Sequence, residues 1–231
     1  MKRFYKDVTV APVDGGWQVM LDSRPIRSQG GSPQVVPTQA LAELMAAEWR
    51  EQGEVIDIAR FAMRDMADYA IDIVANERAD VVEKLLTYGD TDTLLYRADP
   101  EEPLYQRQRE VWEPLICACE ARHQIAFTRI SGVVHRAQKP ETLAALRARL
   151  EAMDNFTLAG LFNLTSLAAS LITGLAVLED GADVPALFSA ANAEEDWQAE
   201  LWGWDPMAQD RRALRAEAFA CAADFVKAVR A

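Results

Sequence analysis

The stretch that decides the fold is residues 34–50, QVVPTQALAELMAAEWR, because the spacing of its apolar side chains changes along it. Before Pro37 the chain clusters residues that favour β-strands, and after it the apolar residues recur at helical spacing. These helical positions are Leu41, Leu44, Met45 and Trp49. Thr38 has the side chain typical of a helix N-cap. The sequence therefore predicts that strands end near Pro37 and that a helix begins after Thr38.

Residues 1–37 are predicted to form a small antiparallel β module. The segments FYKDVTVAPV, residues 4–13, and WQVML, residues 17–21, are rich in β-formers. Asp14-Gly15-Gly16 lies between them and is typical of a hairpin turn. Two further turns are expected at Asp22–Pro25 and Gly30–Pro33, each ahead of a short strand.

Residues 38–231 are predicted to form an α-helical domain. Pro103 and Pro140 stand where a proline suits the first turn of a helix, and the first of these helices should run to about Arg122. The segment IAFTRISG, residues 125–132, is expected to return briefly to extended chain. The fold class is therefore α+β, with a small N-terminal antiparallel β module followed by a larger all-α-helical domain.

Composition argues against a general nucleic-acid binder and against a zinc site. The chain has 231 residues, a formal net charge of −12 and a pI near 4.7, which argues against a general nucleic-acid binder because phosphate contacts need clustered Lys and Arg. Its three cysteines, Cys117, Cys119 and Cys221, are expected to be free thiols in a reducing compartment. With only two histidines, a zinc site has few ligands to draw on. No metal and no cofactor are expected.

The one candidate for a membrane span is FTLAGLFNLTSLAASLITGLAVL, residues 156–178. Its length would suffice, but Asn163, Thr165 and several further hydroxyl side chains interrupt it, and acids rather than Lys or Arg flank it. We expect instead a single, mostly buried helix that packs through its Gly, Ala and Ser positions. No stable membrane insertion is predicted, and the N-terminus shows no apolar signal core.

Few residues offer catalytic chemistry, because no phosphate loop, nucleophile elbow or HExxH motif is present. Asp90 and Asp92 could pair as acid and base or hold a divalent cation, as in a small metal-dependent hydrolase. The alternative is that Asp90, Thr91 or Asp92 caps a short helix while Arg97 balances a carboxylate. The two histidines, His123 and His135, are expected to be structural.

Residues 194–212, EEDWQAELWGWDPMAQDRR, hold half of the six tryptophans together with a series of carboxylates. Gly203 is expected to end one helix, and Asp205 and Pro206 to begin the next as its N-cap and first residue. One interpretation is a helical hairpin whose tryptophans belong to the core. The other is an aromatic rim with a carboxylate cluster, a composition suited to binding another protein.

Several blocks in this chain resemble, in the same order, a family of assembly chaperones for the catalytic head of F-type ATP synthase. They are RFYKDVTV with GWQVMLDSRPIRS, VPTQALAELMAAEWREQGEVID, TDTLLYRA, LYQRQREVWEPL and WQAELWGWDPMAQDRR. Together they cover most of the chain. Ser23 departs from the glycine common at its position, and the segment at residues 61–65 lacks an expected proline, which affects only local turns.

The resemblance implies a non-enzymatic chaperone that holds the unassembled alpha subunit until the beta subunit replaces it. It also implies an essential acidic residue in the C-terminal helices, for which Glu194 or Glu195 is the candidate. The expected partner-binding residues are Glu194, Glu195, Asp196, Trp197, Glu200 and Trp202. We expect Trp197 or Trp202 to anchor the helix in the domain while the carboxylates face the partner. The expected compartment is the bacterial cytoplasm, and an adaptor of another complex is the remaining alternative.

Overall fold

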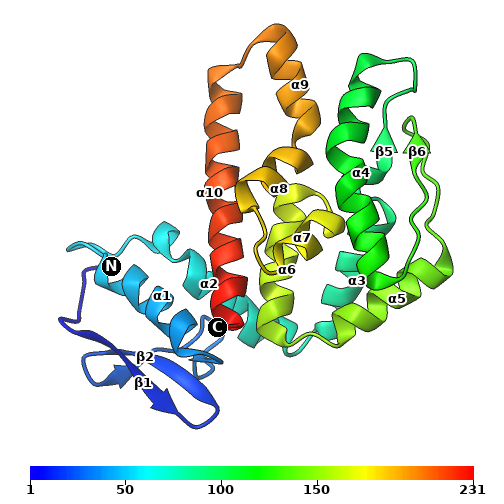
Figure 1. The fold of residues 1–231 in the computed structure, drawn as a ribbon. Coiled ribbons are helices and arrows are strands. Elements are labelled where there is room, and N and C mark those ends of the chain that lie inside the picture. Colours follow the sequence, from blue (N-terminus) through cyan, green and yellow to red (C-terminus); the bar gives the residue numbers. More distant parts are fainter. The chain divides into compact units, whose positions relative to one another are not determined.

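The computed structural model describes residues 1–231, which form two compact units. The first unit comprises Met1–Arg78, Asp154–Gly160 and Asp224–Ala231, and the second comprises Ala79–Met153 and Leu161–Ala223. Helices α6 and α10 contribute residues to both units, and both helices are labelled in Figure 1.

The first unit begins with a four-stranded antiparallel sheet in which β2 is the central strand. Its strands are β1 (Val8–Val13), β2 (Gly16–Leu21), β3 (Arg24–Pro25) and β4 (Val35–Val36), and the other three all pair with β2. The register pairs Val13 with Gly16, so the turn consists of Asp14 and Gly15, while Gly16 of the predicted Asp14-Gly15-Gly16 turn begins β2. Gly15 has a φ of 83°, a conformation that favours glycine.

Helix α1 (Gln39–Arg50) begins where the sequence predicts, and Thr38 caps it by accepting a 3.2 Å hydrogen bond from the Leu41 N–H. Its buried side chains recur at helical spacing and are Leu41, Ala42, Met45, Ala46 and Trp49. This face packs on β1 and β2, which removes the apolar surface of both elements from water.

Helix α1 also positions the next helical segment, which consists of η1 (Ile58–Arg60), α2 (Ala62–Asp68) and a π-helical turn (Tyr69–Val74). Glu48 of α1 accepts hydrogen bonds from the backbone N–H groups of Met63, at 2.6 Å, and Arg64, at 3.0 Å. A carboxylate from another helix thus satisfies the first turn of α2, which lacks a side-chain cap of its own.

The change from strands to helices falls near Pro37, as predicted, and the α+β class is confirmed. The compact units follow a different division, because α1 and α2 group with the sheet rather than with the remaining helices. The physical reason is packing. The spacing of the apolar residues in the sequence marks the end of the strands, whereas the buried face of α1 packs against β1 and β2.

The second unit is almost entirely helical and centres on α4 (Pro103–His123), which packs against α7, α8 and α9. The elements of this part of the chain are α3 (Arg78–Asp90), η3 (Thr93–Leu95), β5 (Tyr96–Arg97), α4, β6 (Ile130–Ser131), α5 (Pro140–Glu151), α6 (Asn155–Ala168), α7 (Leu171–Val177), α8 (Val184–Ala191), α9 (Ala193–Trp202) and α10 (Pro206–Val229). Pro103 and Pro140 stand in the first turn of their helices, as predicted, and β5 pairs with β6 in parallel. Trp112 of α4 is fully buried and donates its indole N–H to the Ala190 carbonyl at 2.7 Å.

The apolar segment 156–178 is not one helix, which corrects the expectation from the sequence. It lies in α6 and α7, and the chain turns between them at Ala169, whose φ is 49°. Ser170 begins α7 because its hydroxyl accepts a 3.0 Å hydrogen bond from the Thr173 N–H. The two helices pack closely: a Cβ at Gly174 would lie 2.6 Å from Oγ1 of Thr165. The structure contains no helix with the length and apolar character needed to cross a bilayer.

Candidate functional site

The predicted partner-binding residues lie on α9, one arm of a helical hairpin with α10 (Figure 1). Gly203, with a φ of 81°, ends α9, and its N–H bonds to the Ala199 carbonyl at 2.8 Å. Asp205 caps α10 by accepting a 3.0 Å hydrogen bond from the Ala208 N–H, and Pro206 is the first helical residue. Both helix boundaries are those that the sequence predicts.

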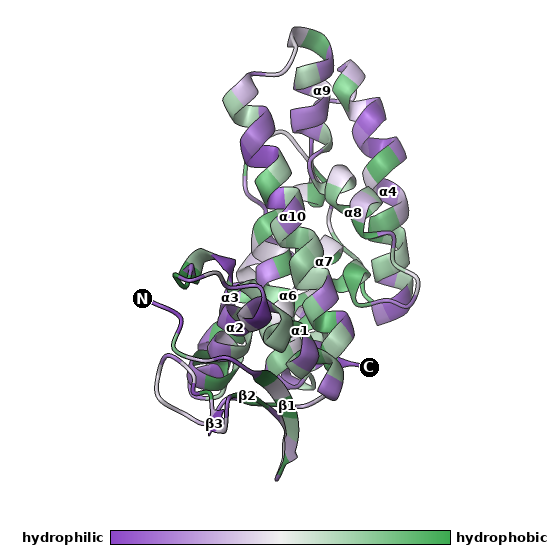
Figure 2. Ribbon diagram, turned by 90° about the vertical axis from the view of Figure 1, so that its left-hand side faces the viewer, coloured by the Kyte–Doolittle hydropathy of each residue, from purple (hydrophilic) through white to green (hydrophobic).

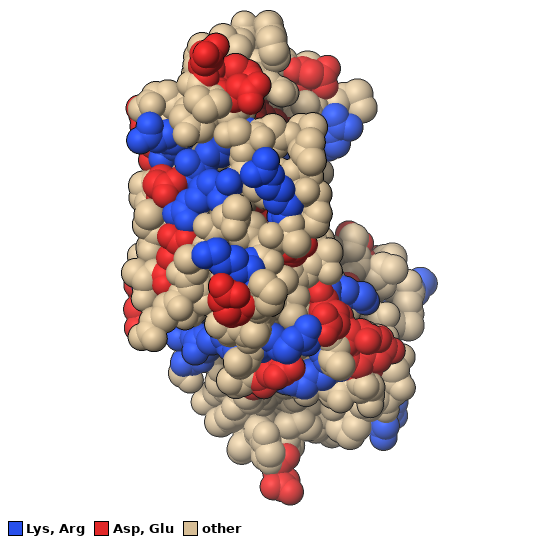
Figure 3. Space-filling model, turned by 90° about the vertical axis from the view of Figure 1, so that its right-hand side faces the viewer, with Lys and Arg blue, Asp and Glu red and all other residues tan.

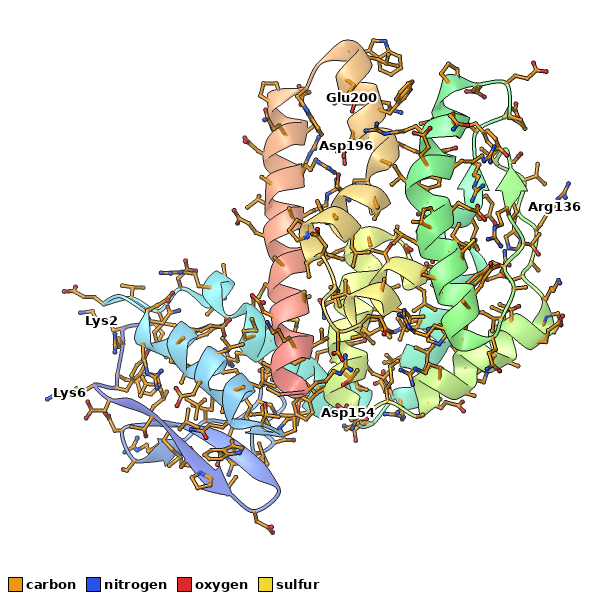
Figure 4. The ribbon with its side chains drawn as sticks, viewed as in Figure 1. Lys2, Lys6, Arg136, Asp154, Asp196 and Glu200 are labelled. Atoms are coloured by element: carbon orange, nitrogen blue, oxygen red, sulfur yellow. The ribbon has the colours of Figure 1, made fainter.

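Two carboxylates of α9 pair with arginines of α10. Arg212 donates to the Asp196 carboxylate at 2.7 Å, and the Ser189 hydroxyl donates to the same oxygen at 3.2 Å. Arg215 forms an ion pair with Glu195, from which Arg212 lies 3.7 Å away. Figure 4 shows Asp196 between the ribbons of α9 and α10. These pairs hold the two arms of the hairpin together.

The other two carboxylates meet α4. The Gln108 side chain donates to Glu194 at 2.6 Å, and Arg107 forms a 3.3 Å ion pair with Glu200. Gln108 is fully buried, whereas Glu194 is exposed and the Glu200 side chain keeps 55% of its surface accessible. Each of the four carboxylates therefore has a partner within the chain, and Glu194 and Glu200 remain the most accessible to another protein.

The tryptophans of the hairpin do not lie in the core. Trp202 is 77% exposed and Trp204 is 38% exposed, while Trp197 is partly buried. Trp202 is therefore not a buried anchor; it is the last residue of α9, directly before Gly203, at which the helix ends. Leu201 and Met207 nearby are 55% and 69% exposed. We call the four residues Leu201, Trp202, Trp204 and Met207 the apolar tip. Figure 2 shows hydrophobic segments at this end of the hairpin.

Arg212 connects the ion pairs to the aromatic side chains. Its guanidinium lies 5.3 Å from the ring centre of Phe188 and 5.7 Å from that of Trp204, distances at which a cation is attracted to a ring face. Only 16% of the Arg212 side chain is accessible. This arginine therefore fixes both the Asp196 carboxylate and one ring of the apolar tip.

A family model described as ATP12 chaperone protein matches residues 2–120, slightly more than half of the chain. The chain belongs to the ATP12 chaperone family. Members of this family are chaperones for ATP synthase assembly, not enzymes. One curated relative, the mitochondrial protein atp12 of Schizosaccharomyces pombe, is 25% identical over 214 residues, which cover 87% of this chain and 74% of that protein.

Solved structures of the family share the fold. The crystal structure of Atp12 from Paracoccus denitrificans is 38% identical and superposes with a TM-score of 0.93 over 99% of this chain and 98% of its own. A variant of that protein, in which one aspartate is replaced by lysine, matches equally well. A protein of Agrobacterium tumefaciens is 36% identical, with a TM-score of 0.93 over 98% of this chain and 85% of its own.

Asp90 and Asp92, the alternative catalytic pair, have structural roles. Asp92 is fully buried and accepts hydrogen bonds from the N–H groups of Leu94 at 3.1 Å and Ile172 at 2.9 Å. Burial raises the pKa of Asp92 to about 6. Asp90 lies 2.9 Å from His135 and holds the loop that contains it. No group of three His, Cys, Asp or Glu side chains in the structure could hold a metal ion, so the hydrolase alternative has no support.

Arg97 balances a carboxylate, as predicted, but its partner Glu113 was not foreseen. Glu113 of α4 pairs with Arg97 of β5 and, at 2.7 Å, with Arg129 before β6. Burial raises the pKa of Glu113, but the hydrogen bonds and charges of the two arginines outweigh burial and lower it to about 2.

Figure 3 shows the side of the molecule with α4 and the β5–β6 strands, where Lys and Arg side chains are interspersed with acids. Several basic side chains lie next to one another in the upper half of this face, with acids beside and below them.

Proposed function

We propose that this chain binds the unassembled alpha subunit of F-type ATP synthase and prevents its aggregation until the beta subunit takes its place. The observation that carries the proposal is membership of the ATP12 chaperone family together with a fold shared over 99% of the chain. The choice of the alpha subunit follows from the family resemblance of the sequence blocks. The compartment is the one in which that subunit awaits assembly, the cytoplasm in a bacterium.

The physical requirement for such a chaperone is clear. A subunit made for a ring exposes large apolar interfaces before assembly, and exposed apolar patches aggregate. A chaperone must cover such a patch and still release it, which favours a small interface of moderate affinity with a polar rim. An apolar centre with carboxylates around it, as on the hairpin of α9 and α10, has this composition.

We propose that the partner-binding residues lie on α9. The candidates remain Glu194, Glu195, Asp196, Trp197, Glu200 and Trp202, and their accessibility ranks them. Trp202, Glu194 and Glu200 are accessible and would touch the partner directly. Asp196 and Glu195 hold α9 against α10 and would act through the shape of the hairpin.

The experiment is an aggregation assay with purified subunits. The alpha and beta subunits of the same organism are diluted separately from denaturant, and light scattering is followed with and without this chain. We expect scattering of the alpha subunit to be suppressed near equimolar chaperone and that of the beta subunit to be unaffected. Suppression of the beta subunit alone, or of neither, would refute the choice of partner, and capture of a different complex from lysate would favour the adaptor alternative.

A further inference from the structure

The apolar tip is unusual for its exposure. Trp202 is 77% exposed, Met207 69% and Leu201 55%, and all three lie within seven residues of chain. Single exposed apolar residues are normal on protein surfaces, but contiguous ones mark interaction sites. Tryptophan in particular is enriched among the residues that dominate binding energies at protein interfaces. The tip therefore has the composition of a binding surface.

The backbone turn of the tip and one of its rings, that of Trp204, are held in place before any partner binds. Gly203 turns the chain between the helices, and Asp205 caps α10 directly beneath the tip. The Arg212 guanidinium lies 5.7 Å from the ring centre of Trp204 while it pairs with Asp196. Fixing a surface in advance lowers the entropy that binding must overcome. A flexible loop of the same composition would bind less tightly.

The charges around the tip limit which surfaces it can bind. Between Ala193 and Asp210 the chain has six carboxylates and no lysine or arginine. Of these carboxylates, Glu195 and Asp196 are paired with Arg212 and Arg215, and Glu200 forms an exposed ion pair with Arg107. The unpaired charges nearest the tip in sequence are therefore those of Asp205 and Asp210. Like charges repel a second copy of the same tip and the anionic surface of a lipid bilayer. The matching surface is an apolar protein surface edged by Lys or Arg.

We infer that the apolar tip inserts into an apolar surface of the unassembled alpha subunit that is bordered by basic side chains. This inference rests on the proposed function and adds the residues and the chemistry of contact. Trp202 and Met207 supply the buried centre of the interface, and Glu200 supplies an acidic edge. The apolar contacts give most of the affinity. The acids orient the alpha subunit, and salt weakens their attraction to its basic side chains.

The first test removes the apolar side chains. The double variant Trp202→Ala/Met207→Ala is compared with the wild type for half-maximal protection of the alpha subunit and for melting temperature. We expect at least tenfold more of the double variant to be needed, with the melting temperature unchanged. The matched control, Val133→Ala/Val134→Ala, removes two valines that are 96% and 73% exposed elsewhere, and should protect as the wild type does. Equal protection by both double variants would overturn the inference while leaving the proposed function intact.

The second test addresses the acidic edge and the rival occupants. Glu200→Lys should weaken protection several-fold, and the weakening should shrink at high salt, while Glu77→Lys at an exposed position of the first unit should have no effect. Sedimentation of the chain alone and with phosphatidylglycerol vesicles completes the comparison. Self-association or vesicle binding that is lost in Trp202→Ala/Met207→Ala would overturn the inference in favour of a second copy or a lipid surface. If the wild type fails to protect the alpha subunit at all, the proposed function itself fails.

Discussion

Asp196 on α9 and Arg212 on α10 form a 2.7 Å ion pair across the hairpin, with only 21% and 16% of their side chains accessible. The Asp196 carboxylate therefore stabilises the hairpin of the chaperone in the absence of a bound alpha subunit. Replacing an acid on α9 can thus impair function in two ways, by loss of a contact or by loss of the hairpin geometry.

Charge reversal should affect the two neighbouring glutamates differently. Glu195→Lys places a third cation beside Arg212 and Arg215 and should lower the free energy of unfolding by about 1–2 kcal/mol. Glu194→Lys loses only the hydrogen bond from Gln108 at an exposed position and should cost about 0.5–1 kcal/mol. Urea denaturation of both variants measures the difference. A smaller loss for Glu195→Lys than for Glu194→Lys would contradict the ion-pair account.

Two tryptophans should respond in opposite ways to truncation. Trp202 is 77% exposed, so Trp202→Ala should change the free energy of unfolding by no more than about 0.5 kcal/mol. Trp112 is fully buried and hydrogen-bonded, so Trp112→Ala should cost about 3–5 kcal/mol. Thermal unfolding of the two variants makes the comparison. A large drop for Trp202→Ala would mean that its ring packs inside the protein.

The contact of α6 with the end of α10 in the first unit depends on a glycine. A Cβ at Gly160 would lie 2.2 Å from Cγ1 of Val226 and 3.1 Å from the ring of Phe225, so Gly160→Ala should lower stability by about 1–3 kcal/mol. Gly53→Ala is the matched control, because a Cβ there meets nothing within 4 Å. Chemical denaturation should leave the control within about 0.5 kcal/mol of the wild type. Equal stability of both variants would show that the helices can separate without cost.

Glu113 should make stability depend on pH in the acid range. Its pKa is lowered to about 2 from a usual value of 4.5, so its ion pairs stabilise the folded state above pH 4.5 and are lost as the pH falls towards 2. Because 36% of the side chain is accessible, the screened contribution is about 1 kcal/mol. The free energy of unfolding, measured between pH 5 and pH 3, should fall less steeply in Glu113→Gln than in the wild type. Parallel curves for the two proteins would rule out this role.

The helix boundaries could be predicted because their causes are local. The Thr38 and Asp205 side chains cap the N–H groups three residues ahead of them, and Gly15 closes a two-residue turn. Such features depend on residues within one turn of helix or one hairpin, which are adjacent in the sequence. The break at Ala169 was missed because the apolar pattern continues through it, and only the Ser170 cap marks the new helix.

The sequence by itself determined the change from strands to helices at Pro37 and the caps of α1 and α10, because these depend on residues adjacent in the chain. It also determined the family, through the order of the sequence blocks. Only the tertiary structure decided that Asp196 pairs with Arg212, that Glu113 lies between two arginines and that Trp202 faces water. The ion-pair partners lie 16 residues apart in each case, on different segments of the chain. Burial and pairing at such separations depend on how the elements pack, which no periodicity within a single element records.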